Sequence, residues 1–116
     1  MIRKFIKIEE GQKCQLGNYL WSIARLVTLV KDFEVMVIPL KHLNVYYSYS
    51  NLTLRDMVMH MNTVNDADLS YPIILDEDGE LMDGRHRIMK AMLNGDKTIK
   101  AVRFKENPLP CEELED

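Results

Sequence analysis

The chain has 116 residues, of which 47% are hydrophobic and 28% are charged, and its formal net charge is −3. These values are typical of one soluble globular domain with a single hydrophobic core, and they argue against disorder and against a fibrous repeat. The acidic balance argues against a general coat for DNA, because such affinity comes from many Lys and Arg side chains that neutralise phosphates. Any phosphate site must therefore be local.

Two further properties bear on the cellular compartment. Cys14 and Cys111 belong to no Cys-x-x-Cys or Cys/His pattern, so we expect reduced thiols without a bridge, a zinc ion or a catalytic role. The N-terminus lacks the apolar run of a signal peptide, and the longest apolar stretch, residues 19–30, is shorter than the roughly 20 residues that span a bilayer. We therefore expect a cytoplasmic protein that binds no membrane.

The first third of the chain predicts an arm, a helix and a strand. Residues 1–17 mix charges with isolated apolar residues and glycines, which indicates an N-terminal arm with a short strand and a loop. From Asn18 the apolar residues recur at helical spacing, which predicts a helix over residues 18–31 with Asn18 as its N-cap. Residues 33–39 are rich in β-branched side chains and predict a strand that ends at its proline.

A connection with little regular structure, residues 41–52, precedes a second helix. Thr53, followed three positions later by Asp56, has the pattern of a capping box and predicts the start of that helix. Apolar residues at i, i+3, i+4 and i+7 extend it over residues 54–62: Leu54, Met57, Val58 and Met61. We expect the methionines of the helical stripes to fill the core: Met57, Met61, Met89 and Met92.

A β-hairpin and a third helix follow. Residues 73–75 and 80–82 predict two strands joined by the turn Asp76-Glu77-Asp78-Gly79. Residues 85–94 predict a helix that ends at Gly95, and three of its residues should face inward: Ile88, Ala91 and Met92.

Residues 98–104 predict a last strand, and the acidic tail over residues 105–116 is expected to fray. The elements together predict one α/β (α+β) domain over residues 1–116. In it, a mixed sheet that brings together the strands at 73–75, 80–82 and 99–104 carries packed helices.

The most informative segment is the junction between the predicted hairpin and its following helix, Asp83-Gly84-Arg85-His86-Arg87. A helix N-terminus carries about half a positive charge, so cations in the first turn are disfavoured by roughly 0.3 to 1 kcal/mol each. Two arginines and a histidine are expected there if an anion is bound, because backbone N–H groups and guanidinium groups together bind phosphate. Gly84 has no Cβ, which lets a ligand approach the backbone.

A second interpretation of this segment needs no ligand. Asp83 would cap the helix and pair with Arg87, while Arg85 and His86 would be solvated. Asp83 and Asp68 are candidate accessory groups for a bound Mg²⁺, but a cap and a turn residue are the simpler roles. The spacing alone does not decide between these interpretations, and it identifies no catalytic residue and no metal site.

Other side chains carry weaker signals. His42 and His60 have no partner pattern and are expected at the surface or in packing. Trp21 lies in an apolar segment and is expected to be buried. The better candidates for stacking a base are three tyrosines of the loop: Tyr46, Tyr47 and Tyr49.

The order of these segments resembles the ParB/sulfiredoxin superfamily, and most of all the short ParB-like domains of phages and mobile elements. The resemblance covers residues 35–104. It rests on the strand at 35–40, the helix after Thr53, the strand Tyr71-Pro72-Ile73-Ile74-Leu75, the segment Asp83-Gly84-Arg85-His86-Arg87 with its helix, and the strand at 99–104.

The resemblance implies that Gly84, His86 and Arg87, with Arg85 beside them, hold the phosphate of a nucleotide or nucleic acid. It also implies a nucleoside triphosphate with Mg²⁺ as the ligand, since members include CTP-hydrolysing partition clamps, ATP-using sulfiredoxins, ADP-dependent serine kinases and nucleases. Arg85 stands where sulfiredoxins have a reactive cysteine, so thiol chemistry is not implied. The partition proteins also carry a further arginine-rich nucleotide motif and a downstream helix-turn-helix, for which this chain has no room, so sequence-specific DNA reading is not expected.

Three functions stay open, in this order. The first is binding of a nucleotide or phosphate, with weak hydrolysis, in which Arg87 makes the principal contact. Loss of Arg87 should then weaken affinity about tenfold to a hundredfold with little change in stability. The second is binding or cleavage of nucleic acid, which requires one patch of six cations: Arg85, Arg87, Lys90, Lys97, Lys100 and Arg103. The third is a non-catalytic interaction module.

Overall fold

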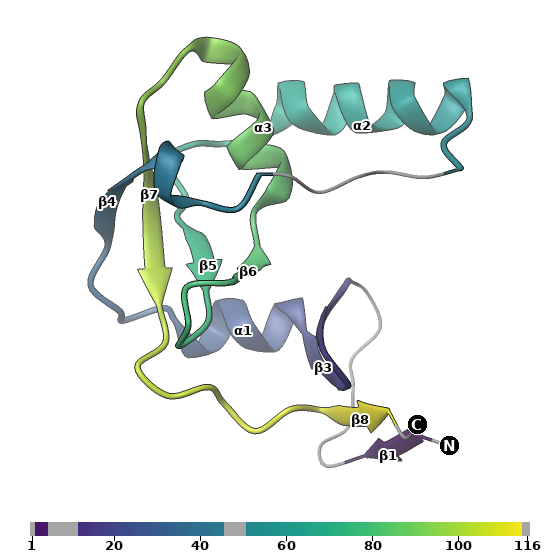
Figure 1. Cartoon of the computed structure of the whole chain (residues 1–116), viewed down its shortest axis with the longest axis vertical. Helices are drawn as coiled ribbons and strands as arrows, with labels where there is room; N and C mark the ends of the chain where they lie inside the picture. The colour runs from purple at the N-terminus through teal and green to yellow at the C-terminus, as the bar shows by residue number, and fades with distance from the viewer. Residues whose placement is uncertain (1, 5–11, 46–50, 115–116) are drawn as a thin grey trace.

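The structure is a computed structural model that describes residues 2–4, 12–45 and 51–114. Within these residues it contains two sheets of four strands each and three α-helices (Figure 1). The elements in chain order are β1 (Ile2–Lys4), β2 (Lys13–Leu16), β3 (Tyr19–Ser22), α1 (Ile23–Leu29), β4 (Met36–Pro39), the 3-10 turn η1 (Leu40–His42), α2 (Leu54–Asp66), β5 (Ile73–Leu75), β6 (Leu81–Asp83), α3 (Arg85–Asn94), β7 (Thr98–Arg103) and β8 (Glu112–Leu114). The α+β class expected from the sequence is confirmed.

The mixed sheet has the strand order β4-β7-β5-β6 and contains the predicted neighbours. Its central pair, β5 and β7, is parallel with Ile74 opposite Val102, and the other pairs are antiparallel. Successive residues of β5 point to opposite faces. Ile73 belongs to a core with Ile88 and Ala101 under α3, whereas Ile74 belongs to a second core. That second core lies toward α1 and the other sheet and includes Cys14, Trp21, Leu26, Val102 and Phe104.

The second sheet, β1-β8-β3-β2, corrects the predicted helix over residues 18–31. Its first half is strand β3, which pairs with β2 across a two-residue turn with Gly17 at φ +60°. Glycine at the first central position is typical of such hairpins. Ser22, not Asn18, caps α1, since its Oγ accepts the N–H of Arg25 at 3.4 Å. A short apolar run does not reveal its period, so strand and helix look alike in sequence.

The acidic tail does not fray as expected in its described part. Strand β8 lies between β1 and β3 and pairs with both (Figure 1). The segment before it is anchored as well, because Cys111 is fully buried and its N–H donates to the carbonyl of Leu20 at 2.7 Å. Trp21 Nε1 donates to the carbonyl of Pro108 at 2.9 Å. These partners lie about ninety residues away in sequence, where local composition gives no signal.

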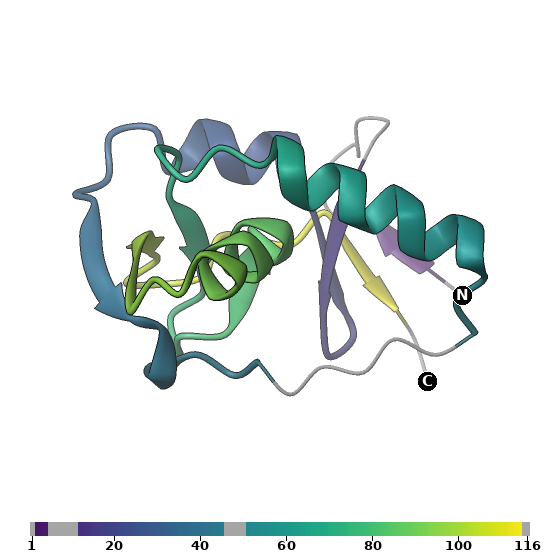
Figure 2. The same cartoon turned by 90° about the horizontal axis from the view of Figure 1, so that it is seen from above.

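Helix α2 starts as predicted and runs further than predicted, to Asp66 instead of residue 62. The capping box is confirmed: the N–H of Asp56 donates to Thr53 Oγ1 at 3.1 Å, and the N–H of Thr53 donates to Asp56 Oδ2 at 3.2 Å. The second half of the helix is tied to α3: Lys90 Nζ donates to the carbonyls of Asn65 and Ala67 at 2.9 and 2.7 Å, and His60 contacts His86. The first half projects past α3 and the mixed sheet (Figures 1 and 2).

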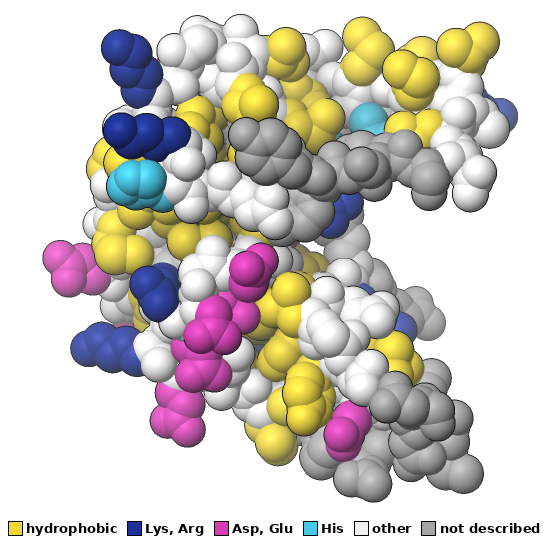
Figure 3. All heavy atoms as spheres, in the orientation of Figure 1, with side chains coloured by type: hydrophobic (Ala, Val, Ile, Leu, Met, Phe, Trp, Pro, Cys, Tyr) yellow, Lys and Arg dark blue, Asp and Glu magenta, His cyan; other side chains and the backbone are white. Residues whose placement is uncertain are grey.

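Because α2 projects, its apolar stripe is exposed and does not fill the core as expected. Val64 is the buried residue of the helix. The stripe residues are between 48% and 83% exposed: Leu54, Met57, Val58 and Met61. Figure 3 shows hydrophobic side chains at the surface along α2. Met92 of α3, also expected to face inward, is 52% exposed.

The hairpin β5–β6 and helix α3 lie where the sequence predicts them. Asp76 holds the turn, since its Oδ1 accepts the N–H groups of Asp78 and Glu80, each at 2.8 Å. Gly95, with φ +74°, ends α3. The loop tyrosines expected to stack a base lie outside the described residues. Among the helices described, none is long and apolar enough to cross a membrane.

Candidate phosphate-binding site

Gly84 joins β6 to α3 and is the N-cap of the helix. Its φ of +115° lies in the region that favours glycine. No side chain at this position caps the helix, so the expected cap by Asp83 is wrong. The first N–H groups of a helix have no acceptor within the helix, and an anion is a suitable partner for them. The N-cap residue of α3 therefore supplies no side-chain acceptor for the N–H groups of the first turn.

Arg87 is engaged by the protein itself. Its Nη1 donates to the carbonyl oxygen of Pro72 at 2.9 Å, and its Nη2 lies 3.5 Å from Asp83 Oδ2. The side chains of Arg87 and Asp83 are only 22% and 17% exposed. The pairing of Asp83 with Arg87, which the ligand-free interpretation expects, is therefore present. It fixes the start of α3 against the segment that leads into β5.

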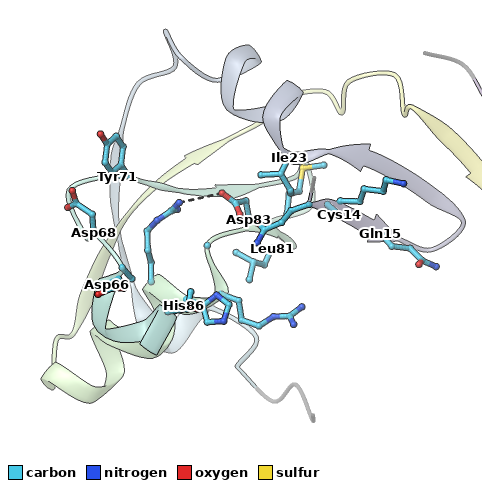
Figure 4. A pocket seen from close by; sticks show the side chains of 17 residues that line it. Cys14, Gln15, Ile23, Asp66, Asp68, Tyr71, Leu81, Asp83 and His86 are labelled. Atoms are coloured by element: carbon cyan, nitrogen blue, oxygen red, sulfur yellow. Dashed lines mark hydrogen bonds and ion pairs between the residues drawn. The ribbon is translucent and has the colours of Figure 1, made fainter. Parts of the chain in front are cut away.

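A cavity of about 590 Å³ opens beside this junction. Figure 4 shows Asp66, Asp68 and Tyr71 on one side of it and Cys14 and Gln15 on the other. Its charged lining combines both signs: Lys13, Arg85, His86 and Arg87 against Asp66, Asp68 and Asp83. The residues predicted for phosphate binding, together with the two predicted accessory carboxylates, thus line one cavity.

The cations of the lining come from two separate parts of the fold. Arg85 and His86 belong to the first turn of α3, whereas Lys13 is at the start of β2. Lys13 and Arg85 are exposed, as side chains that contact a dissolved anion must be. No sequence pattern marks Lys13 as part of the site, because the residue reaches this cavity through the packing of β2 beside β6.

His86 has a partner that the sequence did not reveal. His60 Nδ1, on α2, lies 2.9 Å from His86 Nε2, on α3. His60 was expected at the surface or in packing, and it packs half-buried against His86 although no sequence pattern links the two. Burial, His60 and Arg85 lower the pKa of His86, while Asp83 acts in the opposite direction. His86 is therefore biased toward its neutral form when no anion is bound.

The carboxylates differ in how far they are already used. Asp68 Oδ1 accepts the N–H and the hydroxyl of Ser70 at 2.9 and 2.7 Å, and these bonds lower its pKa. It is thus a turn residue, as the simpler interpretation expects. In the part of the chain that the structure describes, no group of three or more His, Cys, Asp or Glu is arranged to hold a metal ion. A Mg²⁺ ion here would need phosphate oxygens and water beside Asp66 and Asp68.

Cys14 also lines the cavity, but as a thiol rather than a thiolate. Burial, followed by the charges of Asp76 and Asp83, raises its pKa to about 11. The thiolate is the reactive form of cysteine, and at neutral pH almost none is present. Cys14 and Cys111 are both free and buried. The cavity therefore has no activated thiol among its described lining residues.

No family model and no curated protein matches the chain. Among solved structures, the chain is similar to a Pnob8-like ParB-N domain, with a TM-score of 0.41 and 15% sequence identity. The match covers 66% of this chain and 31% of the other, so it spans about a third of that protein.

Proposed function

We propose that the chain binds a phosphate-bearing nucleotide in the cavity at the start of α3. The observation that carries the proposal is that Lys13, Arg85 and His86 line one cavity together with Gly84, the N-cap residue of α3. Guanidinium, ammonium and imidazolium groups beside backbone N–H groups are the donors that bind phosphate.

The remaining lining supports a nucleotide over phosphate alone. Tyr71 is 64% exposed and borders the same cavity, where its ring is available to stack on a base. Asp66 and Asp68 line the cavity together with the cations and supply carboxylate oxygens for a Mg²⁺ ion that a triphosphate carries. A volume of about 590 Å³ is of the size that small-molecule sites have.

Calorimetric titration with ATP, CTP, GTP and ADP, each with and without Mg²⁺, tests this proposal. Arg85→Ala should weaken the affinity for the bound nucleotide by about tenfold, because it removes a charge-assisted contact. Arg55→Ala is the matched control, since Arg55 is exposed on α2 and does not line the cavity. Equal affinity of the wild type and Arg85→Ala, or no binding of any nucleotide, contradicts the proposal. Weak hydrolysis stays a prediction, tested by phosphate release.

For nucleic-acid binding, the described residues offer no observation comparable to the cavity lining. It requires six cations in one patch, yet Arg87, Lys90 and Arg103 each donate to main-chain carbonyls of the protein. On the face shown in Figure 3, acidic side chains form a row and the Lys and Arg side chains are scattered. Such a surface does not concentrate positive potential.

An interaction module is a second candidate, favoured by the exposed stripe of α2. Apolar residues that recur on one projecting helix face mark sites of protein association. Light scattering over a range of concentrations tests whether the chain self-associates. Val58→Lys should abolish any self-association, and a monomer at every concentration removes a second copy of the chain as the partner.

A further inference from the structure

The geometry of His60 and His86 defines what the two rings share. The nitrogens are 2.9 Å apart, the ring centroids are 5.2 Å apart and the ring planes differ by 26°. The centroid distance exceeds the nitrogen distance by two ring radii, so both nitrogens lie on the line between the centroids. The rings therefore meet edge to edge, with the nitrogens pointing at each other. Two nitrogens that bound the same metal ion would instead both point toward the ion, which would lie off the line between the centroids.

The space between His60 Nδ1 and His86 Nε2 holds one proton and not two. A distance of 2.9 Å is that of an N–H···N hydrogen bond, in which one nitrogen donates and the other accepts. If both rings were cationic, two N–H groups would face each other. The pair can therefore carry at most one positive charge while the contact lasts.

In the singly charged pair, the proton positions are fixed. One proton lies between the rings, and each ring then carries a proton on its other nitrogen. His86 Nδ1 is consequently a donor whichever ring holds the charge. In the neutral pair, by contrast, one of the two outer nitrogens is bare. Uptake of one proton thus gives the cavity both a positive charge and a donor at His86 Nδ1.

The charges around His86 set its resting state. Burial acts most strongly on it, followed by His60 on α2, Arg85 on α3 and Asp83 on β6. Three of these influences disfavour a charge on His86, and Asp83 alone favours it. A bound anion would add a strong influence of the same sign as Asp83.

We propose that His60 is a positioning residue that acts through His86, so that the anion site takes up one proton when a phosphate group binds. This inference rests on the proposed phosphate site. His60 holds the His86 ring by one nitrogen and leaves the other for the anion, and it opposes a positive charge on His86 until an anion binds. Anion affinity should accordingly rise as the pH falls.

The ligand-free pair is tested first, by long-range ¹H–¹⁵N NMR of the imidazole nitrogens between about pH 5 and pH 8, where histidine changes charge. The two rings should titrate in a coupled manner, and His60→Asn should move the titration of His86 to higher pH, because the effect of His60 is lost. Asparagine keeps an acceptor near the position of Nδ1 but does not titrate. His42→Asn, at an exposed histidine of η1, is the matched control and should change nothing.

The link to the anion is tested with sulfate, which stays doubly charged over this pH range, in calorimetric titrations at constant ionic strength. Wild-type affinity should be at least about tenfold higher at the acidic end of the range than at the alkaline end. In His60→Asn the midpoint of this profile should move to higher pH, while His42→Asn should follow the wild type. A structural role of His60 would lower affinity at every pH without moving the midpoint.

The outcomes separate the two proposals. If sulfate binds with a flat pH profile, or if His60→Asn leaves the midpoint in place, the role of His60 is wrong and the phosphate site stands. If sulfate and nucleotides fail to bind at every pH although the rings titrate together, the phosphate site is wrong and the link to the anion falls with it. Independent titration of the two rings overturns the pair itself.

Discussion

Gly84 lies so close to Ile73 that a Cβ on residue 84 would come within 2.4 Å of Ile73 Cγ2 and 2.8 Å of Ile73 Cβ. Ile73 is fully buried in strand β5, so it has no space into which to move. The contact lets the start of α3 sit directly against the mixed sheet. The glycine is thus required by the fold at the same place where the proposed anion would approach the backbone.

Gly84→Ala should therefore destabilise the protein by roughly 2 to 4 kcal/mol, the sum of an unfavourable positive φ and an overpacked contact. Gly79→Ala is the matched control, because Gly79 also has a positive φ, of +85°, but a Cβ there would meet nothing within 4 Å. Urea denaturation measures both variants. Equal losses of unfolding free energy would show that the contact with Ile73 costs nothing.

Arg87→Ala should lower the free energy of unfolding by about 1.5 to 3 kcal/mol, because the carbonyl of Pro72 loses a charged donor and Asp83 loses its partner. This differs from the expectation drawn from sequence, in which stability changes little. Arg55→Ala, at an exposed position of α2, should stay within about 0.5 kcal/mol of the wild type. Thermal or urea unfolding that shows no difference between the two variants contradicts the structural role of Arg87.

The Cys14 thiol should make stability depend on alkaline pH. Its pKa is about 11 in the folded protein and 9.0 as the ordinary value, so the folded state holds the proton more tightly. Between these two values the unfolded chain loses its proton first, and stability should fall as the pH rises. Cys14→Val should remove this part of the pH dependence. The measurement is urea unfolding at a series of alkaline pH values, and parallel curves for both proteins would refute it.

Two valines of α2 should respond in opposite ways to substitution. Val58 is 63% exposed, and Val58→Lys should change the free energy of unfolding by less than about 0.5 kcal/mol. Val64 is 3% exposed, and Val64→Ala should cost roughly 2 kcal/mol through lost burial and the cavity left behind. A large loss for Val58→Lys would mean that the stripe of α2 is covered within the folded chain.

The elements whose signals are local could be predicted from the amino-acid sequence. The capping box at Thr53, the turn at Asp76 and the glycine at residue 95 each act through bonds or backbone angles within a few residues, and each element was predicted close to its place. The cluster Asp83-Gly84-Arg85-His86-Arg87 stood out for the same reason, since cations in the first turn of a helix conflict with a local rule.

Contacts between distant segments set which side chains meet and which faces are buried, and these contacts could not be predicted from the sequence. His60 and His86 are separated by 26 positions, and no local pattern links them. Strand β8 pairs with β1 and β3, which lie at the other end of the chain. The stripe of α2 is exposed because the helix extends past the surface that would cover it. Periodicity shows that a helix has an apolar face, but burial of that face needs a partner surface, and the partner is set by contacts between segments far apart in sequence.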